Sequence, residues 1–480
     1  MTDVAIIGCG IVGAAVAYEL SRFDLSVTVL EKENDVAAGT TKANSAIIHA
    51  GYHSVPGTLM AKLNVEGVSL AGELCRKLDV PYKRCGAMVA AFAQRDIPVL
   101  RRLYVQGVKN GVPGLNIVTG EQARQMEPNL SGGVTAALLA PSAMIVSPWE
   151  YTLALIETAM LNGAALHLES EVTAIEKTDV GWRLVTPDFV LPAKNIINAA
   201  GVHADAVHNM ALPPSFRIIP DRGEYYILDK SEGKHVGKVI FQCPVKYGKG
   251  TLVAPTVHGN LIVGPGNEKI GDAEDTATTA TGLALVAERA KKILPNINFK
   301  TCIRNFAGVR AASDIDDFII NQPAPGFIDL AGIKSPGLSA APAIARMAVD
   351  LLRESGLELS EKKGFTDTRK RVRFTDLSFD ERVELARRNP AYGRIICRCE
   401  TVTEGEILDA MNGRIPPRSV DAVKRRCNPG MGRCQGGFCS PKIVRLLAEH
   451  QGIAATEVLQ DRAGSCILAG GIKEALRDAI

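Results

Sequence analysis

The chain has 480 residues, long enough for two or three domains with a large core. Its hydrophobic content of 46% and charged content of 22% are ordinary for a soluble globular protein, and the formal net charge of +3 is too small to indicate nucleic acid as a partner. No stretch reaches the length of a membrane span, and glycines interrupt the apolar N-terminal run too early for a signal peptide.

The N-terminal residues carry the most informative pattern in the chain. Residues 4–7 predict a buried strand, residues 14–22 a helix with small residues on its inner face, and residues 27–30 a second strand. A G-x-G-x-x-G motif at residues 8–13 joins the first strand to the helix. A strand, this motif, a helix and a second strand in that order predict a dinucleotide-binding unit.

Each glycine of the motif has a physical role in such a unit. Gly8 permits the tight turn, Gly10 lets the backbone approach a pyrophosphate, and Gly13 lets the helix pack close to the strand. Glu31 ends the second strand, where a carboxylate can accept hydrogen bonds from an adenosine ribose. An acid at this position favours FAD or NAD over NADP.

A stretch of small and polar residues follows at 39–51 and contains His49. Small residues suit close approach to a flat or phosphate-bearing ligand. His49 has two interpretations, a structural histidine with satisfied hydrogen bonds or a group that faces the substrate.

Apolar periodicity predicts alternating helices and strands up to residue 201. The expected helices are 59–78, 97–110 and 149–161, and the expected strands are 80–92, 165–168, 172–175, 182–186 and 196–201. The last strand ends on small residues, as strands beside a bound nucleotide do.

Residues 218–266 show short strands, proline and glycine, typical of an antiparallel sheet in a substrate-binding lobe. A helix is expected at 276–293, strands at 317–320 and 328–330, and a helix at 340–352. The segment 354–394 is rich in charge and poor in apolar runs, so we interpret it as a solvated linker.

The cysteines indicate a second site near the C-terminus. Of eleven cysteines, Cys397 and Cys399 form a C-x-C and Cys434 and Cys439 a C-x₄-C, with glycines beside the second pair. C-x-C is tighter than the usual spacing of a zinc site, whereas iron–sulfur clusters take varied four-cysteine spacings, so the spacing favours [2Fe–2S] over zinc. Cys427 is a spare thiol that could replace one ligand. Five further cysteines read as core residues in a reducing compartment: Cys9, Cys75, Cys85, Cys243 and Cys302. Cys466 lies in a glycine-flanked tail. We expect a cytoplasmic protein, with peripheral contact at the inner membrane face left open.

The N-terminal motif, Glu31 and the 42–51 stretch resemble the D-amino-acid-oxidase-type FAD superfamily. Within it they resemble FAD-dependent glycerol-3-phosphate dehydrogenases and L-2-hydroxyglutarate dehydrogenases. Residues 332–338 are similar to the closing flavin-contacting stretch of the latter and differ from the corresponding glycerol-3-phosphate dehydrogenase segment, which keeps 2-hydroxy acids open as substrates. Residues 397–439 resemble the bacterioferritin-associated-ferredoxin-type [2Fe–2S] domain, which the anaerobic glycerol-3-phosphate dehydrogenase large subunit also carries at its C-terminus.

The resemblance implies an α/β fold: a Rossmann-like, doubly wound FAD-binding domain with an inserted mixed or antiparallel substrate sheet, then a small helical iron–sulfur domain. It implies an oxidoreductase at 1–355, with FAD-binding parts at about 1–85, 145–215 and 300–355 and a substrate lobe at about 86–144 and 216–299. A charged linker (356–392), the [2Fe–2S] domain (393–450) and a tail (451–480) would follow.

The resemblance also assigns residues to the two cofactors, FAD and a [2Fe–2S] cluster. The FAD-binding residues would be Gly8, Gly10, Gly13, Glu31, Thr40, Thr41, Asn44, Ser45, Val172, Ala200, Gly201, Gly337 and Leu338. The cluster ligands would be Cys397, Cys399, Cys434 and Cys439. His49 and Arg310 would lie over the flavin ring.

We expect oxidation of a secondary alcohol beside an anionic group, with hydride transfer to flavin. His49 is the candidate base, His258 the second choice, and Arg310 would pair with the anionic group of a small substrate. The cluster would relay electrons to an accepting protein subunit or carrier. Glycerol 3-phosphate is the first candidate substrate, an L-2-hydroxy acid or related amine the second, and a non-catalytic electron-transfer subunit the third interpretation.

Overall fold

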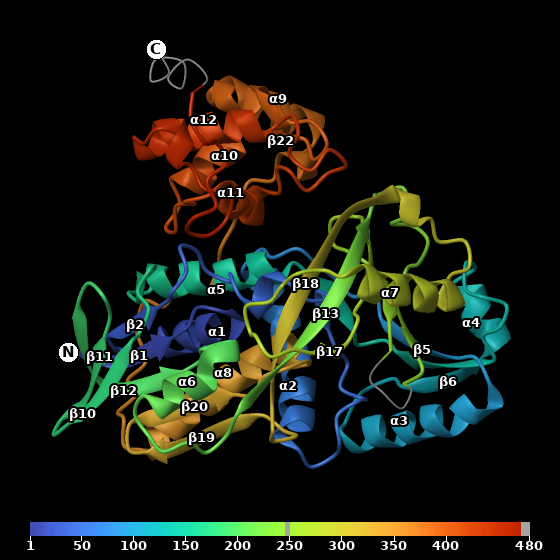
Figure 1. Ribbon diagram of the computed structural model, residues 1–480, viewed down its shortest axis with the longest axis horizontal. Coiled ribbons are helices and arrows are strands. Elements are labelled where there is room, and N and C mark those ends of the chain that lie inside the picture. Colours follow the sequence, from blue (N-terminus) through green and yellow to red (C-terminus); the bar gives the residue numbers. More distant parts are fainter. Residues whose placement is uncertain (245–249, 472–480) are drawn as a thin grey trace. The chain divides into compact units, whose positions relative to one another are not determined.

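The computed structural model describes residues 1–244 and 250–471 (Figure 1). The contacts divide the chain into two units. The larger comprises Met1–Glu31 and Ala37–Arg369, and the smaller comprises Lys32–Val36 and the chain from Lys370 onward. The short segment Lys32–Val36 thus belongs with the C-terminal unit although it directly follows the second strand of the large one.

The large unit contains an eight-stranded sheet with a parallel centre. Strand β1 (Thr2–Ile7) lies between β2 (Val27–Leu30) and β12 (Val190–Asn198), parallel to both. Further strands extend this sheet on both sides: β9 (Ala165–His167), β10 (Ala174–Thr178), β11 (Gly181–Val185), β19 (Ile319–Ala324) and β20 (Phe327–Ala331). The buried strands are apolar on both faces, as parallel strands between two layers must be.

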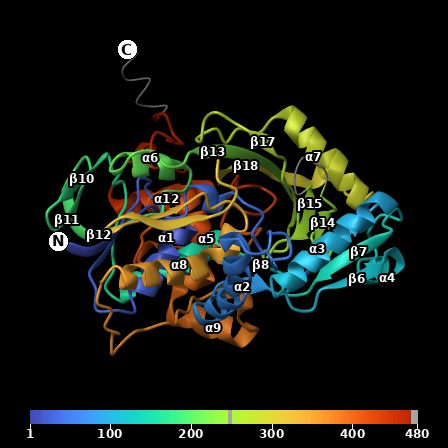
Figure 2. The ribbon, with the colours of Figure 1, turned by 90° about the horizontal axis from the view of Figure 1, so that it is seen from below.

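Helices cover both faces of this sheet. Figure 2 shows α1 (Ile11–Leu20), α5 (Pro148–Leu161) and α8 (Gly337–Glu354) grouped together, with α1 packed on both of the others. On the opposite face, Ala5 and Ile7 join a buried cluster with α6 (Ala204–Asn209) and with Trp182 and Phe327. The doubly wound arrangement expected from the sequence is therefore confirmed.

The second sheet has nine strands and is mixed. Its members are β5 (Ala87–Ala91), β6 (Asn116–Thr119), β7 (Ala136–Ala140), β13 (Ile218–Leu228), β14 (Val239–Gln242), β15 (Leu252–Pro255), β16 (Leu261–Gly264), β17 (Glu268–Lys269) and β18 (Cys302–Ser313). Among the described strands of this sheet, β14 and β5 alone pair in parallel. Helices α3 (Ile97–Lys109), α4 (Gly120–Met126) and α7 (Ala280–Ile293) pack around it, so the expected inserted lobe is present.

A small third sheet contains three strands, in the order β3 (Ile47–Ile48), β8 (Met144–Val146) and β4 (Tyr82–Lys83). Helix α2 (Leu59–Lys77) lies between β3 and β4 in the chain. It crosses α8 at Gly67, where an added Cβ would lie 2.1 Å from the Ser339 carbonyl oxygen. Within the described residues, no helix combines the length and apolar character that crossing a membrane requires.

The C-terminal unit is mostly helical. It contains α9 (Phe379–Arg388), α10 (Glu404–Met411), α11 (Val420–Cys427), α12 (Ser440–Gln451) and the two short strands β21 (Ile395–Cys397) and β22 (Val402–Thr403). Helix α9 falls in the segment that we interpreted as a charged, solvated linker. Its N-terminus is fixed by a capping box between Ser378 and Glu381, and its residues are exposed or half-buried, which is why no apolar run marks it in the sequence.

We predict that Gly67→Ala destabilises the large unit by about 1–3 kcal/mol, because the new methyl group would force the α2–α8 crossing apart. Thermal unfolding of the full chain measures the change. Gly132→Ala is the matched control, since nothing lies within 4 Å of its added Cβ. Equal melting temperatures of the two variants would contradict the prediction.

Candidate functional site

The glycines of residues 8–13 are required by close backbone packing. Gly8 has φ +97°, and a Cβ there would lie 2.6 Å from the Ala199 carbonyl oxygen. A Cβ on Gly13 would lie 2.0 Å from the Gly8 carbonyl oxygen. The loop is therefore held between the carboxyl ends of β1 and β12 and the start of α1, as a dinucleotide loop requires.

The N-terminus of α1 is available to an anion. Its N-cap residue, Gly10, makes no side-chain cap, and the first turn holds no acidic residue. The Ile11 amide donates a hydrogen bond to the Thr41 hydroxyl at 3.0 Å, which draws the next predicted FAD-binding segment to the same place. Backbone amides and the helix dipole at such a terminus suit a pyrophosphate.

Glu31 is fixed at the end of β2. One of its carboxylate oxygens accepts a hydrogen bond from the Cys9 amide at 2.7 Å, and the side chain is buried. The Cys9 carbonyl oxygen in turn accepts a hydrogen bond from the Ala37 amide at 3.0 Å. The structure thus joins Glu31 to the glycine loop, and this position agrees with the predicted ribose contact.

The segment that contains Thr40, Thr41, Asn44 and Ser45 is locked between the glycine loop and β18. The Thr40 hydroxyl donates to the Val309 carbonyl oxygen at 2.6 Å, and the Asn44 side-chain Nδ2 donates to the Thr41 carbonyl oxygen at 2.8 Å. Ser45 is half-buried beside them in the sequence. These short polar side chains order their own backbone.

The remaining predicted FAD-binding residues lie at three element ends. Val172 is buried in the cluster beneath Leu30, and Ala200 and Gly201 follow β12 directly. Gly337 and Leu338 open α8, an 18-residue helix whose N-cap makes no side-chain hydrogen bond and whose first turn lacks acids. This second uncapped helix N-terminus fits the electron-rich edge of a flavin. The residues present therefore fit FAD.

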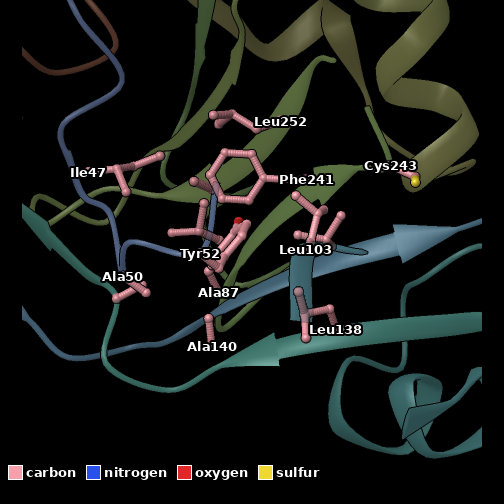
Figure 3. Close-up of a cluster of buried hydrophobic side chains, with 14 of the residues drawn as sticks. Ile47, Ala50, Tyr52, Ala87, Leu103, Leu138, Ala140, Phe241, Cys243 and Leu252 are labelled. Carbon is pink, nitrogen blue, oxygen red and sulfur yellow. The ribbon is translucent and has the colours of Figure 1, made fainter. Parts of the chain in front are cut away.

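His49 lines a cavity of the large unit whose walls come from β5, β14, α2, α3 and the loop that follows β3. The other side chains of this cavity include Tyr52, His53, Asn64 and Phe241, and the His49 and Phe241 rings lie 5.8 Å apart. Figure 3 shows Phe241 and Tyr52 close together within the buried cluster that forms the floor of this region.

The backbone of His49 is held on both sides. Its amide donates to the Ser339 hydroxyl at 2.7 Å, and its carbonyl oxygen accepts from the Asn64 side chain at 2.9 Å. Its ring Nε2 lies 3.2 Å from the Ser335 hydroxyl, next to the start of α8. The ring is therefore positioned at the end of the helix that the resemblance assigns to the flavin, where a base for substrate is needed.

Arg310 lies on β18 and faces β13. Its guanidinium group is 2.9 Å from Asp221 and donates to the Asn267 side chain and the Gly266 carbonyl oxygen, each at 3.1 Å. Burial disfavours its charge, but Tyr225 and Asp221 outweigh burial and raise the pKa of Arg310. Arg310 is not among the residues that line the His49 cavity, so its contact with an anionic substrate stays a prediction.

His258 occupies the turn between β15 and β16. Its ring stacks on Trp149 at a centroid distance of 6.1 Å and an interplanar angle of 8°. It also does not line the His49 cavity. The geometry supports His49 more strongly than His258 as the base, since the His49 ring opens onto that cavity.

Sequence reasoning missed part of this cavity. Phe241 comes from β14 and Tyr52 from the loop after β3, and neither belongs to a motif. Ser335 lies within the segment 332–338 that the resemblance assigned to the flavin, but its approach to His49 has no local signal. These residues are far apart in the chain and meet only in the tertiary structure.

The four predicted cluster ligands lie in two thiol pairs. The sulfur atoms of Cys399 and Cys434 are 3.6 Å apart, and the Cys397 and Cys439 thiols form a hydrogen bond. No group of three or more His, Cys, Asp or Glu in the described part of the chain is arranged around a single ion. Two close thiol pairs agree with a centre of two irons in which each iron is bound by two cysteines.

In each thiol pair one cysteine has a lowered pKa and its partner, Cys439 or Cys399, a raised pKa. The hydrogen bond from Cys439 lowers the pKa of Cys397 to about 6, and the Gly430 and Glu400 amides assist. Burial opposes ionisation of Cys434, but the Phe438 and Gly436 amides and the Cys399 thiol lower its pKa. Because a Cβ on Gly432 would lie 2.2 Å from the Cys399 Cβ, glycine is needed to bring the two loops together.

Cys427 does not belong to either pair. It is buried in the core of the C-terminal unit, where its thiol donates to the Val423 carbonyl oxygen within α11. All eleven cysteines are described as free thiols, so none of them forms a disulfide.

Comparison with known proteins agrees with both sites. Residues 3–351 match the model of the family described as FAD dependent oxidoreductase, and residues 395–449 match the BFD-like [2Fe-2S] binding domain. The chain is 48% identical over 476 residues to a glycerol 3-phosphate dehydrogenase of Caloramator mitchellensis, a match that covers 98% of this chain and 99% of the relative. A human mitochondrial L-2-hydroxyglutarate dehydrogenase is 28% identical, in a match that covers 73% of this chain and 89% of the relative.

A solved structure shows the same relationship. The dithionite-reduced L-alpha-glycerophosphate oxidase of Mycoplasma pneumoniae, with FAD bound, superimposes with a TM-score of 0.73 at 31% identity, covering 76% of this chain and 98% of that one. The FAD and [2Fe–2S] cofactors expected from the sequence are thereby confirmed. The chain belongs to the FAD-dependent oxidoreductase family and carries a BFD-like [2Fe–2S] domain at its C-terminal end.

Proposed function

We propose that this protein is a dehydrogenase that oxidises sn-glycerol 3-phosphate to dihydroxyacetone phosphate and passes the electrons to a protein acceptor. The observation that carries the proposal is the match to a glycerol 3-phosphate dehydrogenase over 98% of the chain, which includes both cofactor domains. The L-alpha-glycerophosphate oxidase matches 76% of the chain and supports the same substrate for the FAD-binding part.

The chemistry divides between His49 and the cofactors. Oxidation of the secondary alcohol removes the hydroxyl proton and a hydride from carbon 2, and FAD when bound supplies the hydride acceptor. His49 accepts the proton at Nε2, the ring nitrogen that faces Ser335. The fixed His49 backbone holds the ring in place while the proton is transferred.

Arg310 binds the phosphate group of the substrate in this proposal. Its planar guanidinium group suits two phosphate oxygens, and Asp221 keeps it oriented. Because Asp221, Asn267 and Gly266 already occupy part of its hydrogen-bonding capacity, substrate binding exchanges some of these contacts. The [2Fe–2S] centre supplies one-electron chemistry, which a direct reaction of flavin with oxygen would not need.

An L-2-hydroxy acid is the second candidate substrate. It is supported by residues 332–338, which are similar to the corresponding stretch of L-2-hydroxyglutarate dehydrogenases, and by the likeness to the human enzyme.

We expect sn-glycerol 3-phosphate to bleach the bound flavin under anaerobic conditions, and L-2-hydroxyglutarate to leave it oxidised. Absorbance at the flavin bands after mixing measures both. If L-2-hydroxyglutarate alone bleaches the flavin, the substrate is an L-2-hydroxy acid and glycerol 3-phosphate is excluded. If neither compound bleaches it, the result favours a non-catalytic electron-transfer subunit.

His49→Ala should reduce the rate of flavin reduction by about 10²–10⁴-fold, because the hydroxyl proton loses its acceptor, while FAD stays bound. His235→Ala is the control, since His235 pairs with Glu232 away from the cavity. Stopped-flow absorbance gives the rate. Reduction at the wild-type rate in His49→Ala would exclude His49 as the base.

Cys434→Ser should abolish the visible absorption of the [2Fe–2S] cluster and leave flavin reduction by substrate intact, because one thiol pair loses a member. Cys466→Ser, at an exposed cysteine, should retain the cluster. If the Cys434 variant also loses flavin reduction, then reduction of the flavin by substrate depends on the [2Fe–2S] domain, which contradicts the prediction.

A further inference from the structure

The loop Lys32–Val36 connects the FAD-binding residues to the [2Fe–2S] unit. It leaves β2 at Glu31, folds with the C-terminal unit, and returns at Ala37. Both of its flanking residues are tied to the same residue of the glycine loop: Glu31 accepts from the Cys9 amide at 2.7 Å, and Ala37 donates to the Cys9 carbonyl oxygen at 3.0 Å.

The middle of the loop is held by a buried ion cluster. One Asp35 carboxylate oxygen accepts from Arg425 at 2.8 and 3.0 Å and from Arg426 at 3.0 Å, and the other accepts from Arg426 at 2.8 Å. Asp35 is 2% exposed and the two arginines are 4% exposed each. Arg425 also binds Asp461 at 2.8 Å.

In this buried ion cluster, each charged side chain depends on its oppositely charged neighbours for stability. Burial disfavours the charged form of Asp35, yet Arg426 and Arg425 outweigh burial and hold its pKa well below the ordinary range. Removing one partner from a buried ion pair leaves a charge without compensation, which is strongly destabilising. The position of Asp35 therefore matters to the fold around Arg425 and Arg426.

These arginines lie directly before the thiol-bearing loop. They occupy the last turn of α11 (Val420–Cys427), and the chain then runs to Gly430, whose amide donates to the Cys397 sulfur. A second contact supports the same segment, since the Asn34 side chain donates to the Asp461 carbonyl oxygen at 2.7 Å.

We propose that this loop couples the two cofactor sites: FAD bound at the glycine loop and Glu31 fixes both ends of Lys32–Val36, which presents Asp35 to Arg425 and Arg426 and stabilises the cluster domain. Asp35 is a positioning residue in this account. A ligand that binds one state of a coupled pair stabilises that state, and the coupling is reciprocal, so the intact cluster domain also strengthens FAD binding.

The test uses the full chain with its cluster, in FAD-loaded and FAD-depleted forms. The measured quantity is the rate at which visible circular dichroism of the cluster is lost at a fixed elevated temperature. We expect FAD removal to accelerate this loss at least about tenfold in the wild type. In Asp35→Asn the loss is fast in both forms, and the effect of FAD disappears.

Asp461→Asn is the matched control, because it removes the same charge from the same arginine but lies outside the loop. It should accelerate cluster loss while the FAD effect persists. A purely structural role for Asp35 would also leave the FAD effect in place, so persistence of that effect in Asp35→Asn overturns the proposal, as does a wild type without any FAD effect.

Two further measurements keep the test decisive. The dissociation constant of FAD should rise in Asp35→Asn and stay unchanged in Asp461→Asn. If Asp35→Asn does not accumulate as folded protein, Asn34→Ala removes only one hydrogen bond of the loop and should reduce the FAD effect. An unchanged FAD effect in Asn34→Ala would then overturn the proposal.

Discussion

The large unit depends on how closely the backbone of β1 and the start of α1 approach their neighbours. At Gly8 and Gly13 there is no space for a side chain, because carbonyl groups lie within 2.6 Å of the added atom. This close approach brings three strand or helix ends to one place: the end of β12, the uncapped start of α1 and Glu31 at the end of β2. A larger residue at either glycine would separate these ends and with them the parts of a nucleotide site.

The two cofactors require opposite surroundings. The His49 cavity shares Tyr52, Val89, Leu103 and Phe241 with a buried apolar cluster, so its lining is largely apolar. The thiols Cys399 and Cys434 are exposed or half-buried, with backbone amides directed at sulfur, which suits exchange of single electrons with another protein. Placing the two centres in separate units lets each have its own environment.

The features that were predictable from the sequence are local ones. The glycine motif and the paired cysteine spacings each describe residues close together in the chain, and the structure joins the glycine motif to Glu31 as expected. The short strands of residues 218–266 predicted an antiparallel sheet, and this pattern gave no sign of the parallel pairing of β14 with β5. Helix α9 was missed because charged residues hide its periodicity.

Contacts between residues that are far apart in the chain could not be predicted from the sequence. Phe241 meets His49 across about 190 positions, and Asp35 meets Arg426 across about 390. The ion pair of Arg310 with Asp221 arises from the register of β13 and β18, which no motif specifies. Such contacts follow from the tertiary arrangement and not from patterning.

The most direct test of the account is an electron paramagnetic resonance measurement on the anaerobic protein after addition of sn-glycerol 3-phosphate. The account predicts the signal of a reduced [2Fe–2S] cluster, because electrons taken from this substrate reach the C-terminal domain. A cluster that is reduced by dithionite but stays oxidised with excess sn-glycerol 3-phosphate would contradict it.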